Sequence, residues 1–366
     1  MSGTVSNNLE RGSGIVGASG SGITISSGDP AVDTNPSGGV GTVFTNTTSG
    51  ETYICTTATA GANVWTNVGD GTGDIAPITW FGGRGLCVAG AAGGTNNTIQ
   101  YITIASTGDS TDFGDLTRTT HSGGACSDGS RGVEGGGHGG TDIGYVTIAS
   151  TGNAIDFGVN LTQHRYLLTA TSNDTRGIFL GGIIPWTTNI CDYVTIQTTG
   201  ACADFGDLSR AKYGNGSFSN GTRAFAFGGY ILWTAVDDIE FVNFASLGNA
   251  TDFGDLSTSA HAGGEGVEDL TRGVMADTSA ADSDNLTYVT MASNGNASAF
   301  GGLHTLQYES GGVTNGSGGR GVWMGGQGAA ADDTMQYITI ASTGDAADFG
   351  DLTINVNDYN AGCSGD

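Results

Sequence analysis

Residues 101–116 read YITIASTGDSTDFGDL, and residues 337–352 repeat them as YITIASTGDAADFGDL with two changes. An Asp-Phe-Gly triplet holds a metal ion in kinase active sites, so the first question is whether this stretch belongs to an active site or builds the fold. Related stretches recur along the chain, and each is followed at a fixed distance by a phenylalanine. They begin at Tyr101, Tyr145, Tyr193, Phe241, Tyr288 and Tyr337, and the phenylalanines are Phe113, Phe157, Phe205, Phe253, Phe300 and Phe349. The spacing of 44 to 49 residues between the starts indicates an internal repeat of six units.

Each unit also contains an arginine that opens a short apolar run, which usually ends in a pair of glycines. These arginines are Arg84, Arg131, Arg176, Arg223, Arg272 and Arg320. Between the phenylalanine of one unit and the arginine of the next lie a further strand, such as residues 166–171, and a polar turn. One unit therefore holds four short strands. A period of about 40–50 residues with four strands predicts the blades of a β-propeller.

At these positions the unit resembles a kelch repeat, as SNGTRAFAFGG at residues 219–229 illustrates. In that family an apolar second strand ends in Gly-Gly, a tyrosine lies in the third strand, and an aromatic residue follows about a dozen residues later. The resemblance covers residues 78–366. It implies a propeller but not a function, since such propellers serve as enzymes, adaptors and structural parts. Phenylalanine replaces the usual tryptophan, and residues 275–280, MADTSA, replace a Gly pair, so we expect the fifth blade to be irregular.

The two ends of the repeat array complement each other. Residues 78–90 supply a second strand without a first, and residues 352–366 supply a first strand without a second. Joining them predicts an all-β, six-bladed kelch-like propeller that is closed by its C-terminal strand. Cys87 and Cys363 would then lie in adjacent strands. The six cysteines show no CxxC spacing, so we expect free thiols, with a Cys87–Cys363 disulfide as the alternative.

Composition restricts the partners. The chain has 11 Lys and Arg against 36 Asp and Glu, a net charge of −25, which repels nucleic acid and anionic membranes. No stretch approaches the ~20 apolar residues that a membrane span needs, and the first residues show no export signal. With 67 glycines and 4 prolines, the chain is expected to be rich in tight turns.

The region before the repeats differs from them. Residues 1–40 are rich in Gly, Ser and Asn, which predicts an extended attachment segment, and residues 41–75 are typical of a small β module of three short strands. The module resembles one found near the N-terminus of bacteriophage tail-fibre and other virion proteins, and the propeller repeats resemble those of marine phage structural proteins. Because the module is too small to be secure alone, we expect it to pack on the propeller or on another subunit.

The Asp-Phe-Gly triplets do not indicate a kinase. They recur at Asp112, Asp156, Asp204, Asp252 and Asp348, whereas the chain has a single lysine, Lys212. We expect the phenylalanine to anchor one blade on the next, the glycine to allow a tight backbone path, and the aspartates to accept backbone N–H groups. Calcium binding by residues 106–115 is the alternative, although Asp109 is replaced by Ala201 in the third unit.

No catalytic constellation stands out among the histidines, and we expect no catalytic residues, no metal and no cofactor. His121 and His261 occupy equivalent positions in two units, which indicates a position that belongs to the repeat and not to a functional site. We call this position the repeat slot. His138, in the loop GGGHGG, has no equivalent and is a candidate ligand, with an ordinary solvent-facing role as the alternative.

The segments that do not repeat are more informative about function. They connect the second and third strands and share one end of the propeller with the connections between blades. Two neighbouring units place Pro185, Trp186, Tyr230, Leu232 and Trp233 there. Such an apolar patch on a polar chain suggests contact with another protein or a sugar. The alternative is that these side chains fold down and seal the propeller's own end.

Together these features predict a non-enzymatic virion structural protein: a phage tail fibre, appendage or capsid decoration protein, assembled in the host cytoplasm. The N-terminal region would attach it to other virion proteins, and the propeller would contact a host-surface glycan or protein or a neighbouring virion protein. A homo-oligomer, first of all a trimer, is expected from that class. The alternatives are a carbohydrate-binding or carbohydrate-processing propeller and a secreted adhesin.

Overall fold

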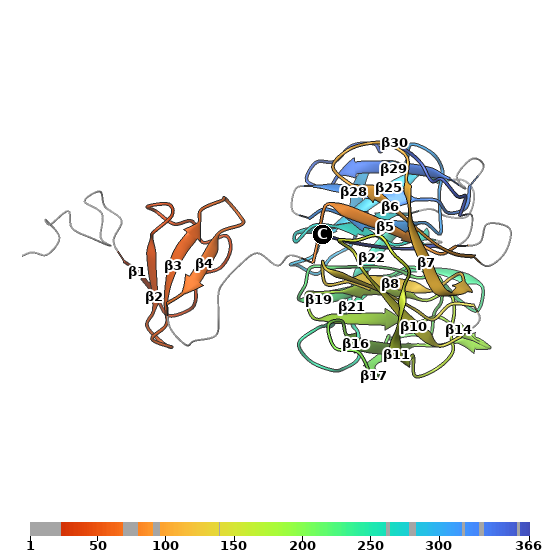
Figure 1. Cartoon of the computed structure of the whole chain (residues 1–366), viewed down its shortest axis with the longest axis horizontal. Coiled ribbons are helices and arrows are strands. Elements are labelled where there is room, and N and C mark those ends of the chain that lie inside the picture. Colours follow the sequence, from red (N-terminus) through yellow and green to blue (C-terminus); the bar gives the residue numbers. More distant parts are fainter. Residues whose placement is uncertain are drawn as a thin grey trace, which may run out of the picture. The chain divides into compact units, whose positions relative to one another are not determined.

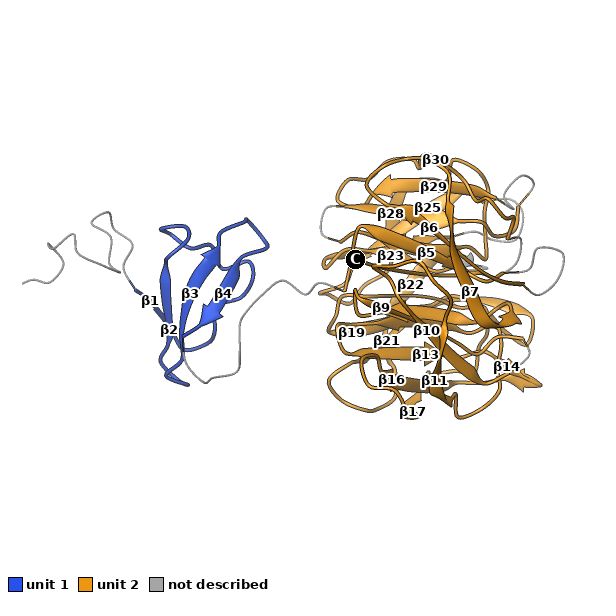
Figure 2. Cartoon of the chain, in the orientation of Figure 1, with its two compact units in different colours: residues 1–78 blue, residues 79–366 orange. Residues whose placement is uncertain are grey.

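The computed structural model describes residues 23–68, 80–90, 96–138, 140–260, 264–277, 283–316, 319–328, 333–356 and 359–366, without the side chains of residues 258–260. The chain divides into two compact units, Met1–Ile78 and Thr79–Asp366 (Figure 2). The described residues form strands, turns and loops, and they include no helix that is long and apolar enough to cross a membrane.

The first unit contains one four-stranded sheet. Its strands are β1 (Thr24–Ser26), β2 (Val43–Asn46), β3 (Thr52–Thr57) and β4 (Val64–Asn67), in the order β1-β2-β3-β4. Their alternating residues bury one side, where Phe44, Tyr53, Cys55 and Trp65 form the core. Residues 24–26, which lie in the predicted extended segment, add a fourth strand to the three predicted for the module, because β1 pairs in parallel with β2.

In the part of the second unit that the structure describes (Figure 1), six antiparallel sheets of four strands or more succeed one another around a ring, beside one two-stranded sheet, and their innermost strands contact those of the neighbouring sheets. The innermost strands are β31 (Ala361–Gly365), β8 (Gly124–Ser127), β12 (Thr169–Ser172), β18 (Gly216–Ser219), β23 (Val267–Glu268) and β27 (Gly311–Thr314). The second strands are β5 (Arg84–Val88), β9 (Arg131–Gly135), β13 (Arg176–Leu180), β19 (Arg223–Phe227), β24 (Arg272–Ala276) and β28 (Arg320–Met324). The third strands are β6 (Asn96–Thr103), β10 (Asp142–Thr147), β16 (Ile190–Thr195), β21 (Thr234–Asn243), β25 (Asn285–Thr290) and β29 (Thr334–Thr339). The outermost strands are β7 (Thr111–Thr120), β11 (Ile155–Asn160), β17 (Cys202–Asp207), β22 (Thr251–Ala260), β26 (Ser298–Gly302) and β30 (Ala347–Asp351).

This architecture confirms the predicted β-propeller and its closure by the last strand. β31 pairs with β5, so the first sheet takes its inner strand from the C-terminus. Cys363 lies opposite Leu86, and Cys87 lies opposite Gly362, so the two thiols are one residue apart in register and point to opposite faces of the sheet. Both are free, as expected. The fifth sheet is irregular as predicted, since its inner strand β23 has only two residues.

An arginine joins each sheet to the next. The arginine that opens each second strand lies over the aromatic ring of its own third strand, with 4.3–5.1 Å between the guanidinium carbon and the ring centre. The same guanidinium donates a hydrogen bond of 2.5–3.5 Å to a backbone carbonyl in the following sheet. The last bond, from Arg320 to the carbonyl of Ile104, returns to the first sheet and closes the ring. Sequence analysis found these arginines but not their role.

The repeated Asp-Phe-Gly-Asp stretch forms a second connection between sheets. In the first sheet, Phe113 is buried, its carbonyl accepts the N–H of Gly152 in the next sheet, and the N–H of Asp115 donates to Asn153. The phenylalanine carbonyl of every sheet but the second accepts the equivalent glycine N–H in this way. The stretch therefore builds the propeller, as predicted. The boundary between the second and third sheets is less tightly packed at this point. A Cβ at Gly158, the equivalent of Gly114, would meet no atom within 4 Å.

Gly114→Ala tests this connection. Gly114 has φ +147°, and a Cβ there would lie 2.5 Å from the carbonyl oxygen of Gly152. We expect Ala to destabilise the propeller by about 2–5 kcal/mol through backbone strain and overpacking, measured by urea unfolding. The matched control is Gly152→Ala, where a Cβ meets nothing within 4 Å. A similar loss of stability in both variants would contradict the proposed contact.

Candidate functional site

The connections that do not repeat gather at one end of the propeller, which we call the loop face. Backbone bridges join Tyr166 to Ile183 and Tyr213 to Tyr230, so the segment entering each inner strand lies beside the connection between second and third strands of the same sheet. In the third sheet that connection is a hairpin of β14 (Ile183–Ile184) and β15 (Trp186–Thr187). In the fourth sheet, β20 (Tyr230–Ile231) pairs with the start of β21.

The predicted apolar residues lie at the tips of these two hairpins. Pro185 is the exposed turn residue of the first, and Trp186 beside it is 75% exposed. In the second, Leu232 and Trp233 are 69% and 82% exposed. The alternative that the two tryptophans seal the end of the propeller is therefore wrong, because a sealing side chain would be buried.

The backbone of the second tip is strained. Ile231 pairs with Thr234, so Leu232 and Trp233 form a two-residue turn, and both have positive φ angles, 47° and 69°. Turns of this kind favour Asn-Gly, because positive φ angles cost bulky residues of order 1–3 kcal/mol each. The strained turn places two large apolar side chains in solvent, where they contribute little to the core.

Two tyrosines pack beneath the second tip, on the side of the propeller. The ring of Tyr213 stacks on Tyr230 at 5.5 Å and meets the edge of Trp233 at 5.8 Å. Burial raises the pKa of Tyr230 to about 12, with smaller contributions from Glu309, Tyr213 and Tyr308. Trp233 thus has a defined position although most of its surface is exposed. Sequence analysis missed Tyr213, but Tyr166, Tyr213 and Tyr308 each stand three residues before an inner strand, a repeat signal that could have revealed it.

His138 lies with different neighbours. Its ring stacks on His121 at 5.0 Å with 11° between the planes, and it meets the edge of Tyr166 at 5.9 Å. The unique loop histidine is thus joined to the repeat slot that His121 represents. His261, the other histidine of that slot, lies outside the described residues. Tyr166 in turn pairs with Ile183 at the base of the Trp186 hairpin, so His138 lies on the loop face near that hairpin.

The opposite end of the propeller, which we call the tether end, receives the chain from the N-terminal side. Here Gly83 N–H donates to the side chain of Asp366, and Trp80 is buried among the ends of the inner strands. Strand β13 runs from Arg176 at the tether end to Leu180 at the loop face, next to the Trp186 hairpin. The loop face therefore points away from the point where the chain enters the propeller.

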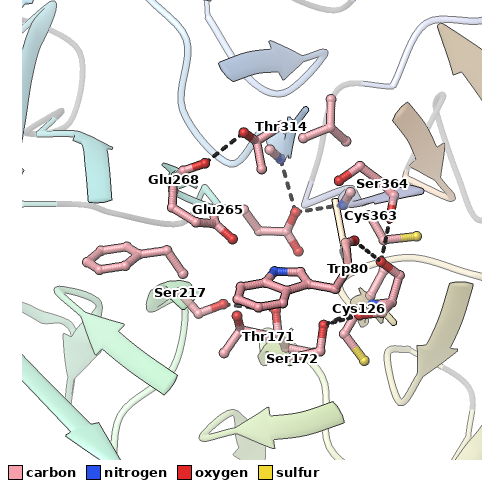
Figure 3. Close-up of a pocket in the computed structure, with 18 of the residues that line it drawn as sticks. Trp80, Cys126, Thr171, Ser172, Ser217, Glu265, Glu268, Thr314, Cys363 and Ser364 are labelled. Atoms are coloured by element: carbon pink, nitrogen blue, oxygen red, sulfur yellow. Dashed lines mark hydrogen bonds between the residues drawn. The ribbon is translucent and has the colours of Figure 1, made fainter. Parts of the chain in front are cut away.

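Trp80 borders the central channel (Figure 3). The inner strands are linked around it by hydroxyl groups: Ser127 donates to the carbonyl of Ser364, and Ser172 donates to that of Ser127. Glu265 joins β27 to β31 by accepting N–H groups of Gly312 and Gly362 at 3.0 and 2.6 Å. The cavity that remains is about 50 Å³, enough for a few water molecules.

Burial favours the neutral form of the two channel carboxyl groups. Burial raises the pKa of Glu268 to about 8 and raises the pKa of Glu265 well above its usual range, against the hydrogen bonds from backbone N–H groups. Figure 3 shows both side chains turned toward Trp80 at the centre of the ring. The described residues contain no group of three or more His, Cys, Asp or Glu side chains arranged to hold a metal ion. The cavity is small, and Trp80 lines it.

The cations of the described region are all used inside the protein. Six of its ten lysine and arginine side chains are the arginines that join the sheets. The other four form ion pairs: Arg118 with Glu134, Arg165 with Asp192, Arg210 with Asp238, and Lys212 with Asp238 and Glu240. The acidic side chains therefore dominate the surface field, which disfavours anionic partners.

Comparisons with known proteins inform the fold alone. No family model matches the chain, and no curated protein matches it. Among solved structures, that of YjhT is similar with a TM-score of 0.51 at 10% sequence identity, covering 65% of this chain and 86% of YjhT. At this identity the likeness supports the propeller-like architecture and carries no function to this chain.

Replacing Leu232–Trp233 by Asn-Gly tests whether the strained turn lowers the stability of the protein. We expect the double variant to unfold at higher urea, with a gain of about 1–2 kcal/mol, because Asn and Gly adopt the observed φ angles with less strain. The control replaces Gly181 by Ala, at φ +66° beside the carbonyl of Lys212, which should lower stability. A destabilised Asn-Gly variant would mean that the two side chains contribute to packing after all.

Proposed function

We propose that this chain is a non-enzymatic structural subunit of a bacteriophage particle, a tail fibre, appendage or capsid decoration protein. It would be attached to other virion proteins through its N-terminal region, and its propeller would contact a host surface or a neighbouring virion protein. The proposal rests on one observation: the point where the chain enters the propeller and the exposed tryptophans lie at opposite ends of it. The chain enters at the tether end, and the exposed Trp186 and Trp233 lie on the loop face.

Three further features support a contact role over catalysis. Large apolar side chains are exposed on a chain of net charge −25, which is expected where a partner covers them. The Leu232–Trp233 turn is strained, as backbones at functional sites often are. The channel carboxyl groups lie beside a cavity of about 50 Å³, which is small for a substrate. A virion location and a trimer remain predictions from the phage resemblance.

Trp186→Ala combined with Trp233→Ala tests the contact on the loop face. We expect the variant to melt as the parent does, because both side chains are more than 70% exposed, and to bind host cells at least tenfold more weakly. The matched control is Leu247→Ala, a 57% exposed residue after β21 at the tether end, which should bind normally. Unchanged binding by the tryptophan variant would remove the loop face from the proposal.

Deleting residues 1–75 tests attachment. The propeller should still fold, because it has its own core clusters and its ring closes through β31 and β5. We expect the deleted protein to be missing from purified particles when it is produced during infection, measured by immunoblot against the full chain. Normal incorporation would contradict attachment through the N-terminal region.

A carbohydrate-binding or carbohydrate-processing propeller is the second candidate. The exposed ring of Trp233, which packs on the buried Tyr213, favours it, since a flat aromatic surface suits the apolar face of a sugar ring. A glycan array and a glycosidase assay, each with the parent and the double-tryptophan variant, separate this function from protein contact. Binding of a glycan that the variant loses would establish it.

A further inference from the structure

The single lysine of the chain, Lys212, is fully buried in the fourth sheet, beside the entry to β18. Its Nζ atom lies 2.8 Å from a carboxylate oxygen of Asp238 and 2.8 Å from one of Glu240. Both acids are on β21, two residues apart. A primary amine and two carboxyl groups therefore meet at a place that solvent hardly reaches.

The third sheet shows what this position needs for packing alone. There Arg165 pairs with Asp192 at 2.6 Å, and both side chains are fully buried. Lys212 and Glu240 occupy the equivalent places in the fourth sheet. Asp192 and Glu240 each accept a backbone N–H from the segment that leads to the inner strand, three residues before the cation. The difference is chemical: an arginine stays protonated, whereas a buried lysine can lose its proton and act as a nucleophile.

Asp238 has no counterpart in the third sheet. Ile190 stands at its position, since the carbonyls of both residues accept the N–H of a glycine that follows the second strand. The second carboxylate oxygen of Asp238 accepts a hydrogen bond from Arg210 at 2.5 Å. The side chains of Lys212 and Glu240 are 0% and 2% exposed, and that of Asp238 is 14% exposed. The fourth sheet thus adds a carboxyl group that packing does not require, at the side from which a small molecule can leave.

We propose that Lys212 and Asp238 become joined by an intramolecular amide bond, with Glu240 as the proton carrier. The Lys212 nitrogen attacks the carboxyl carbon of Asp238, so that an N–C bond forms and one C–O bond breaks. The nitrogen gives up two protons, and both leave with the departing oxygen as one water molecule. Glu240 takes a proton from the nitrogen, passes it to that oxygen and ends as it began. Arg210 stabilises the negative charge on the other oxygen in the tetrahedral intermediate.

Burial favours the amide over the ion pair. The unreacted pair keeps an ammonium and a carboxylate away from water, which is costly, whereas an amide is neutral. Glu240 and Arg210 remain as one negative and one positive charge, so the total charge of the group does not change. Burial alone would raise the pKa of Asp238, but Lys212 and Arg210 hold it below its usual value. The groups therefore start as ions, and the bond should form slowly after folding.

The bond would brace one tip of the loop face. The segment that it closes, between residues 212 and 238, contains the turn of Leu232 and Trp233. A covalent link at its base restricts the unfolded chain and holds the tip in place. The bond goes beyond the proposed function, which stands without it, because the tip is exposed whether or not its base is linked.

Intact-mass spectrometry of the full chain, held at neutral pH until its mass is constant, tests the bond. We expect the parent to be lighter than its sequence by one water molecule. Lys212→Arg should keep the full sequence mass, because it reproduces the ion pair of the third sheet without a nucleophile. Glu240→Gln should also keep it, because the amide can accept the same backbone N–H but cannot carry the proton. The matched control is Asp237→Asn, beside the reacting residue, which should lose water as the parent does.

Trypsin locates the bond. In the linked chain it cannot cut after Lys212, so residues 211–223 should stay joined to residues 224–272 as one branched peptide. A succinimide at an Asp-Gly sequence such as Asp128–Gly129 gives the same mass loss but leaves every peptide linear, and that result would overturn the proposal. A parent at its full sequence mass overturns it as well, whether or not the variants fold. Water loss from the Glu240→Gln variant would contradict the proton transfer on which the proposal rests.

Discussion

The propeller depends on one repeated interaction, the arginine that joins each sheet to the next. Each guanidinium lies over an aromatic ring of its own sheet and donates to a carbonyl of the following sheet, so a single side chain fixes both the distance and the rotation between neighbours. The bond from Arg320 to Ile104 makes the six links circular. These links and four ion pairs engage all ten described cations, so the remaining acidic side chains dominate the surface.

The repeat also explains which parts of the fold follow from sequence. A residue that recurs every 44 to 49 positions occupies a packing position, so the strands, the closure by the last strand and the buried phenylalanines could all be predicted. Trp80 and Glu265 could not, because each occurs once and its role depends on strands brought together around the whole ring. Strand β1 was missed for a related reason: three residues paired in parallel with β2 leave no periodic signal.

The candidate site divides in the same way. The position of Trp186 and Trp233 at one end followed from the order of strands, whereas their exposure did not, since a loop sequence does not reveal whether it folds back onto the ring. The turn at Leu232 and Trp233 decides this for one tip, because its two positive φ angles carry the side chains outward. Each repeat packs against a neighbour on both sides, which restricts its sequence. Only the loops beyond the last hydrogen bond between strands can vary in sequence from one repeat to the next.

Charge then limits where this chain can make contacts. With the described cations engaged in contacts within the protein, an approaching acidic surface is repelled across most of the molecule, and two copies of the chain repel each other as well. The hairpin tips with Trp186 and Trp233 differ from this background. They expose apolar side chains whose burial is favourable at any salt concentration, whereas repulsion between acidic surfaces falls as salt screens it. Contacts through these tips should therefore strengthen with ionic strength, the reverse of what a partner held by the acidic surface would show.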